Sequence, residues 1–159
     1  MAEGGAIEAS RARPLSRARV VLLVSIVAHL LGWALPVMDD YRGLHAFRVA
    51  LSPLWPYERS GTHFHIPAGR LVYLSVGSAL TNVVFAVIAI AALAGAVHTR
   101  SRQRVSVWIV GAATLLNLHW PISMGDSAGN LRAGYYFWIA SFLLLLLAVH
   151  PALAPRARR

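Results

Sequence analysis

Cysteine and lysine are both absent from this chain of 159 residues. Without cysteine the chain can form no disulfide, no thiolate metal site and no thiol redox centre. Charged residues are also scarce: they make up 13% of the chain, whereas soluble domains typically contain about 25%. So few charges cannot cover the surface of a water-soluble domain, and 57% of the residues are hydrophobic. Part of the surface must therefore face lipid.

Four apolar stretches contain no charged residue: 20–37, 71–97, 105–124 and 133–149. A helix needs about 20 mostly apolar residues to cross the ~30 Å hydrocarbon core of a bilayer. The pattern predicts an all-α fold, an integral membrane four-helix bundle with up-down topology. Residues 1–19 would form a basic N-terminal segment, 20–151 the transmembrane domain with an outer loop at 38–70, and 152–159 a basic tail.

The first apolar stretch also follows basic residues, as the apolar region of a signal peptide does. It is long for that role and contains His29, and no small-x-small cleavage site precedes Asp39 and Asp40. We therefore expect this stretch to remain as a membrane anchor.

The orientation follows from the arginines. With four spans, residues 1–19, the link between the second and third spans, and the tail lie on one side. That side holds ten of the fifteen arginines and only Glu3 and Glu8 as acidic residues, whereas the other side has five arginines and four acidic residues. Basic residues are enriched in cytoplasmic loops, so both termini are predicted to be cytoplasmic. The arginines flank apolar runs, which favours anionic lipids as their partners and disfavours nucleic acid.

The outer loop contains a short amphipathic pattern. Leu44, Phe47 and Leu51 would share one helical face, which predicts a helix that lies on the outer membrane surface. Further along, His63 and His65 would share one face of a strand, but two ligands are too few to hold zinc. No metal site is therefore predicted.

Polar residues at mid-membrane depth are the best indication of a site, because such residues are costly in lipid. Depths estimated from a rise of about 1.5 Å per residue place at least one on every span. The polar layer so defined comprises His29, Thr81, Asn82, Asn117, His119 and Ser141.

Three interpretations of this layer remain open. The side chains could be interhelical hydrogen bonds that fix the register of the bundle. His29 and His119 could instead bind a cofactor, either a haem iron held axially or a quinone, although their depths differ by several residues. A polar path for an ion or solute is the third interpretation, but no carboxylate lies in any span.

Aromatic and small residues complete the pattern. Trp33, Trp120 and Trp138 lie near the outer ends of their spans, where an interfacial aromatic belt is expected. On the second span, Gly77 with Thr81 and Ala91 with Gly95 are spaced four residues apart, as in closely packed transmembrane helices.

Three short sequence segments resemble those of other membrane proteins. The sequence from Gly134 to Trp138 followed by Ser141 and Phe142, the phrase 79–82 (ALTN) and the loop phrase 41–47 (YRGLHAF) are similar to those of a loose group of small bacterial four-span membrane proteins. The resemblance covers most of the spanning part. It implies a bacterial inner membrane and says nothing about chemistry.

No set of nucleophile and base, no carboxylate pair and no metal constellation can be read from the sequence, which disfavours an enzyme. We expect a structural or accessory protein that packs against a larger membrane complex or forms a homo-oligomer. The alternatives are a haem- or quinone-associated protein that uses His29 and His119, and a small transporter or channel.

Overall fold

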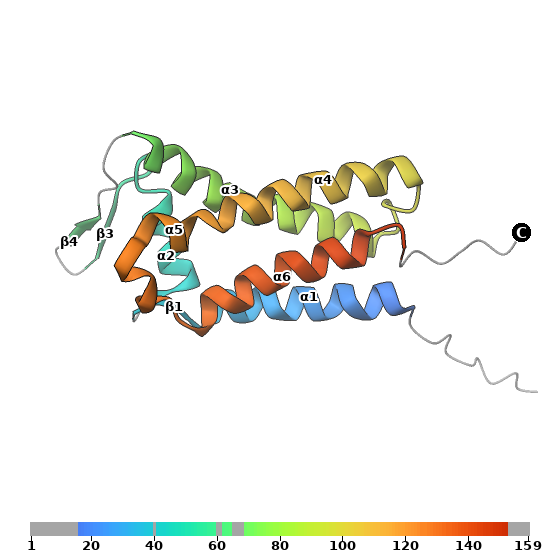
Figure 1. Ribbon diagram of the computed structural model, residues 1–159, viewed down its shortest axis with the longest axis horizontal. Coiled ribbons are helices and arrows are strands. Elements are labelled where there is room, and N and C mark those ends of the chain that lie inside the picture. The colour runs from blue at the N-terminus through green and yellow to red at the C-terminus, as the bar shows by residue number, and fades with distance from the viewer. Residues whose placement is uncertain (1–15, 40, 60–61, 65–68, 153–159) are drawn as a thin grey trace, which may run out of the picture.

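The computed structural model describes residues 16–39, 41–59, 62–64 and 69–152. Four long helices run side by side: α1 (Arg17–Ala34), α3 (Arg70–Leu93), α4 (Arg100–Asn117) and α6 (Ala133–Val149) (Figure 1). In this described part, three helical segments are long and apolar enough to cross a membrane, and α6 is a shorter apolar helix of 17 residues. The predicted all-α membrane bundle is confirmed.

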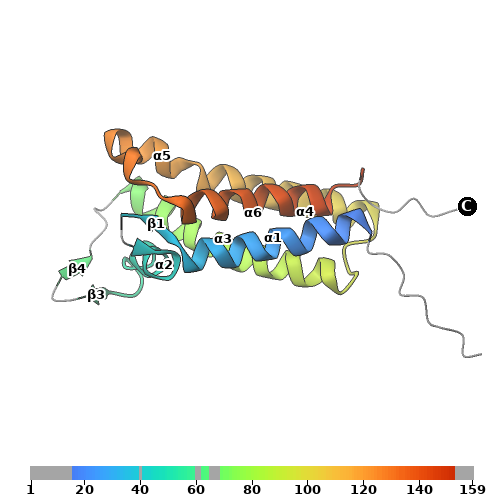
Figure 2. The same cartoon turned by 90° about the horizontal axis from the view of Figure 1, so that it is seen from below.

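The helices form a ring in which α1 packs on α6, α6 on α4, and α4 on α3 (Figures 1 and 2). The contact between α1 and α6 is by far the most extensive, so the first and last helices of the chain are direct neighbours. The start of α1, the end of α6 and the link between α3 and α4 lie at one end, which we call the arginine end. The short elements gather at the other, the loop end.

Helix termini at the arginine end follow ordinary capping rules. Ser16 and Thr99 cap α1 and α4, each accepting a hydrogen bond from the backbone N–H three residues later. α3 ends at Leu93, before the limit of the apolar stretch. There Gly95 adopts a φ of +73°, and the N–H groups of residues 95 and 96 bond back to the carbonyls of residues 92 and 91. This is a Schellman cap, which requires a residue that tolerates positive φ.

This cap corrects the expected role of Gly95. No atom lies within 4 Å of a Cβ built at this residue, so it makes no close helix contact. At Gly77 the expectation holds, because a Cβ there would lie 3.0 Å from Leu116 Cδ2 of α4.

The third apolar stretch was expected to be one helix, and this is wrong in detail. α4 ends at Asn117, and after Leu118 the chain continues as α5 (His119–Met124) and the 3₁₀ helix η1 (Gly125–Asn130). The physical reason is Pro121, which has no N–H to donate to the carbonyl of Asn117 four residues before it.

The predicted amphipathic helix exists as α2 (Gly43–Ala50). Leu44 of the predicted apolar face is exposed, whereas Phe47 of the same face packs against Trp33 of α1, and Ala50 is the buried residue. α2 lies across the loop end and contacts α1 and α3. Gly43 lies close against α1, because a Cβ at this residue would clash with the carbonyl oxygen of Gly32.

Two short hairpins were not anticipated. β1 (Pro36–Met38) pairs with β2 (Tyr41–Arg42), and β3 (Tyr57–Arg59) pairs with β4 (Thr62–Phe64), both antiparallel. β1 also joins the second outer loop, through a bridge between Met38 and Leu131 and a bond from the N–H of Arg132 to the carbonyl of Val37. These bonds tie the end of α1 to the start of α6.

The apolar core fills the half of the bundle nearer the arginine end. Its buried residues come from all four long helices: Leu22, Phe85, Ile88, Ala89, Val110, Ala113, Phe142, Leu145 and Val149. The half nearer the loop end is packed differently, with polar and aromatic side chains.

Candidate functional site

Five of the six residues of the predicted polar layer lie in two hydrogen-bond networks between the helices. The first network joins α1, α3 and α6 around His29 and Asn82. The second joins α3, α4 and α6 around Asn117. His119 belongs to neither.

In the first network, the buried ring of His29 uses both nitrogens. Nδ1 lies 3.0 Å from Ser141 Oγ, and Nε2 accepts from the indole N–H of Trp33 at 3.3 Å. Ser141 Oγ donates its own hydrogen to the carbonyl of Trp138, so it must accept from His29 Nδ1. A neutral ring protonated at Nδ1 satisfies all these bonds. The ring also stacks on Phe85, with centroids 3.8 Å apart.

Asn82 accepts hydrogen bonds from two indole groups, of which that of Trp33 is shared with His29. Its Oδ1 accepts from Trp138 Nε1 at 3.0 Å and shares the Trp33 N–H at 3.3 Å. Its Nδ2 donates to the carbonyl of Ala79 at 2.9 Å. Indole nitrogens can only donate, so the amide oxygen must face them, and this fixes the orientation of the amide.

The second network is centred on Asn117, whose side chain is fully buried. Its Oδ1 accepts from Ser78 Oγ at 2.8 Å, and its Nδ2 donates to Thr81 Oγ1 at 3.0 Å. Thr81 directs its single hydrogen to the carbonyl of Ser78 at 2.6 Å, and Ser78 Oγ also accepts from Trp120 Nε1 at 3.0 Å. The arrangement joins α3 to α4 and α5 at mid-bundle depth.

The same network satisfies the carbonyl that Pro121 leaves free. The carbonyl oxygen of Asn117 accepts from the hydroxyl of Tyr135, which belongs to α6, at 3.2 Å. A buried carbonyl without a partner is costly in lipid, so this bond makes the break after α4 tolerable.

The two histidines that one interpretation pairs around a cofactor have separate surroundings. His29 contacts α3 and α6, whereas His119 Nδ1 bonds to the carbonyl of Leu116 in its own turn and its ring packs against Trp120. An axial haem ligand must offer a free ring nitrogen to the iron. Both nitrogens of His29 have hydrogen-bond partners in this structure. His119 Nε2 is buried without a hydrogen-bond partner.

The tryptophans have a role that the expected interfacial belt does not describe. Trp33, Trp120 and Trp138 are partly buried, and their N–H groups donate to polar atoms inside the bundle. By contrast, Trp108 and Tyr73 are each 79% exposed, as belt residues should be. The sequence could have indicated the contact between Trp33 and His29, because Trp33 follows His29 by four residues, about one helical turn.

Sequence reasoning also missed two buried serines. Ser25 donates to the carbonyl of Ser141 at 2.8 Å and joins α1 to α6. Ser78 belongs to the second network, where it joins Asn117 of α4 to Trp120 of α5. The sequence does indicate a role for Ser78, because Ser75, Ser78 and Asn82 have helical spacing and form a polar stripe on one face of α3.

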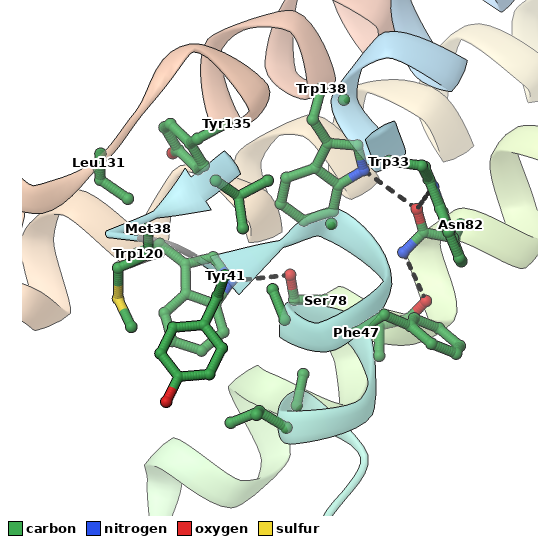
Figure 3. Close-up of a pocket in the computed structure, with 17 residues that line it drawn as sticks. Trp33, Met38, Tyr41, Phe47, Ser78, Asn82, Trp120, Leu131, Tyr135 and Trp138 are labelled. Carbon is green, nitrogen blue, oxygen red and sulfur yellow. Dashed lines mark hydrogen bonds between the residues drawn. The ribbon is translucent and has the colours of Figure 1, made fainter. Parts of the chain in front are cut away.

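Both networks border a cavity of about 180 Å³ at the loop end (Figure 3). Trp33, Trp138 and Asn82 line one side, and Ser78, Trp120 and Tyr41 line the other. The remaining lining residues are apolar or aromatic: Gly32, Val37, Met38, Gly43, Ala46, Phe47, Val49, Ala50, Ala79, Leu131 and Tyr135. No described residue in this lining carries a charge.

The walls of the cavity are held by close backbone contacts. A Cβ on Gly134 would lie 2.6 Å from the carbonyl oxygen of Pro36, and one on Gly32 would lie 2.9 Å from Trp138 Cβ. With Gly43 of α2, three glycines let α1, α2 and α6 meet at the loop end. These close approaches fix the spacing of the helices from which the cavity wall is built.

Residues of the loop end show no metal constellation. In the described ranges, no three His, Asp or Glu side chains could hold a metal ion together. His63 lies in β4, and His65 lies outside the described residues.

No protein-family model matches the chain, and comparisons with curated proteins and with solved structures found no match either.

Proposed function

We propose that this small multi-span membrane protein is a non-enzymatic accessory or interaction protein, which acts by lateral contact with a larger membrane protein or a second copy. One observation carries the proposal: the intramembrane polar side chains bond to one another across the helices. Of the predicted layer, His29, Asn82, Asn117, Thr81 and Ser141 all take part in such bonds. Residues used in this way stabilise a unique bundle.

The alternatives receive less support from the same geometry. A haem held by His29 and His119 lacks a free nitrogen on His29. A channel or transporter needs a wet path across the bundle, yet the core of the half nearer the arginine end contains large apolar side chains such as Phe142 and Leu145, both 0% exposed, beside buried Gln103 and Ser106 of α4.

We place the protein in a bacterial inner membrane, with the arginine end in the cytoplasm. The support is the charge asymmetry, to which Arg100, Arg102 and Arg104 contribute as exposed residues at this end. Anionic lipid headgroups on the cytoplasmic leaflet would attract them, by about 1 kcal/mol for each basic residue near the surface. Nucleic acid is not a proposed partner.

Photo-crosslinking tests the lateral contact. A photoreactive residue is placed at one exposed position on each long helix: Val27 on α1, Val87 on α3, Leu115 on α4 and Leu147 on α6, which are 52–72% exposed. Each variant is irradiated in native membranes. A partner in the membrane plane covers one side of the bundle, so we expect a discrete protein adduct from one position or from two on neighbouring helices.

The pattern across the four positions is the internal control. A probe at Val110, which is 0% exposed, should give no intermolecular adduct. Lipid adducts alone from all four exposed positions would overturn the proposal. An adduct at twice the mass of the chain identifies a homo-oligomer, and a larger heterologous adduct identifies a partner subunit.

A further inference from the structure

The cavity at the loop end has the size of a single ring. Its volume is about 180 Å³. An apolar protein cavity of about 150 Å³ is large enough to bind benzene. A six-membered ring with small substituents therefore fits, whereas a whole lipid does not.

The cavity offers few free hydrogen-bond partners to a water molecule. A buried water usually needs two to four hydrogen-bond partners. The polar atoms around the cavity are mostly used: Asn82 Oδ1 accepts from two indoles, and Ser78 Oγ both donates to Asn117 and accepts from Trp120. An apolar occupant is therefore favoured over water, and the absence of charge in the described lining favours an uncharged one.

The walls select a flat ring. Trp33, Phe47, Trp120, Tyr135 and Trp138 all line the cavity, and they come from four different elements. Aromatic rings prefer stacked or edge-to-face contacts with other rings, and such pairs stabilise beyond the area that they bury. The hydrogen bonds of the three indoles hold their rings in place before any ligand arrives.

One donor remains for a ligand. The amide nitrogen of Asn82 carries two hydrogens. Only one of them is used among the described residues, in the bond to the carbonyl of Ala79. Asn82 lines the cavity, so the second hydrogen suits an acceptor on the ring.

From these four features we infer that the cavity binds an uncharged ring bearing a carbonyl oxygen, the chemistry of a membrane quinone. The ring lies among Trp33, Trp120 and Trp138, and its carbonyl accepts from Asn82 Nδ2. An alkyl tail stays outside the cavity. This site is distinct from the pair of His29 and His119, and it requires no protein partner.

Tryptophan fluorescence tests the inference, because quinones quench indole emission. The other two tryptophans, Trp55 and Trp108, are exposed and are first replaced by phenylalanine. The emission of this background variant then comes only from the cavity wall. Purified protein in mild detergent is titrated with decylubiquinone, and decylbenzene serves as a competitor with the same tail and no carbonyl. We expect saturable quenching with micromolar affinity and weak competition.

Two variants fill the cavity from α2, Ala46→Leu and Val49→Phe. Each should weaken decylubiquinone binding by about tenfold or more, because added side-chain volume excludes the ring. Ala86→Leu is the matched control, since this exposed alanine of α3 lies outside the cavity lining. Circular dichroism shows whether each variant keeps its helices.

The inference fails if quenching rises linearly without saturation and equally in all variants, which indicates partition into the micelle. It also fails if decylbenzene competes as well as the quinone binds. A phospholipid that co-purifies at one equivalent and blocks quenching would assign the cavity to a lipid chain. None of these results affects the crosslinking test of a lateral partner.

Discussion

Asn117 is the side chain on which the second network depends most. It is fully buried and bonds to both Ser78 and Thr81 on α3. Asn117→Leu keeps the branching at Cγ but removes these bonds and leaves two hydroxyl groups with fewer partners. We expect the free energy of unfolding to fall by about 1–2 kcal/mol, measured by thermal or denaturant unfolding in detergent.

The matched control is Asn130→Leu, the same exchange at an exposed position of η1. It should leave the unfolding transition unchanged. If the two variants unfold alike, Asn117 does not hold the bundle together.

Alanine substitutions at two glycines are expected to change the free energy of unfolding in opposite directions. At Gly134 a Cβ would lie 2.6 Å from the carbonyl oxygen of Pro36, so Gly134→Ala must push α1 and α6 apart. We expect a loss of about 1–3 kcal/mol, as for other overpacked sites. At Gly111, in the middle of α4, no atom lies within 4 Å of the Cβ, and alanine should stabilise the helix by up to ~1 kcal/mol. The order of the two melting temperatures checks both statements.

Residue chemistry predicted part of the site and not its geometry. The depth of Asn82 and Asn117 in apolar stretches already marked them as interior groups, because a lipid-facing amide is too costly. Whether the indole rings of Trp33 and Trp138 face the bundle or the lipid could not be predicted in the same way. An indole suits an interface and a buried hydrogen bond equally well. The choice depends on whether an acceptor lies nearby, and that acceptor, Asn82, is on another helix.

At the scale of elements, the break between α4 and α5 couples two distant residues. Pro121 deprives the carbonyl of Asn117 of its helical partner, and Tyr135 supplies a hydroxyl in its place. Tyr135→Phe should therefore cost about 1 kcal/mol in the natural chain. In a Pro121→Ala background the restored N–H can satisfy the carbonyl, so the same exchange should cost much less.

A double-mutant cycle of these four proteins measures the coupling. Unfolding in detergent supplies the four free energies of unfolding. We expect the loss caused by Tyr135→Phe to be smaller in the Pro121→Ala background than in the natural chain. Additive effects would mean that the tyrosine hydroxyl does not replace the missing helical bond.

Long apolar helices were the most predictable elements, since hydropathy alone counts them. The short elements were less predictable for a physical reason. α2 was recognised from its periodicity, but its orientation is decided by the contact of Gly43 with α1, which has no local signal. The bridge between Met38 and Leu131 joins two loops that are far apart in sequence, and no pattern within either loop indicates it.

The whole molecule is divided along its long axis. The half nearer the arginine end has an apolar core, and the half nearer the loop end holds the networks and the cavity. The division explains why no single residue revealed the cavity. It exists only where the ends of α1, α3 and α6 meet α2, so its volume follows from the assembled bundle and not from any one helix.

The direction of the bundle in the membrane decides from which side a ligand or partner reaches the loop end. The first helix starts and the last one ends at the same end of the bundle (Figure 1), and we predict that this end faces the cytoplasm. A fluorescent reporter that matures only in the cytoplasm should be bright when fused after Arg159, and a phosphatase active only outside the cytoplasm should be silent there. Inserted at Pro53 of the outer loop, the two reporters should give the reverse result. Phosphatase activity from the Arg159 fusion would show that the orientation is the reverse of the predicted one. The loop end with its cavity would then lie on the cytoplasmic side, an orientation that the positive-inside rule disfavours.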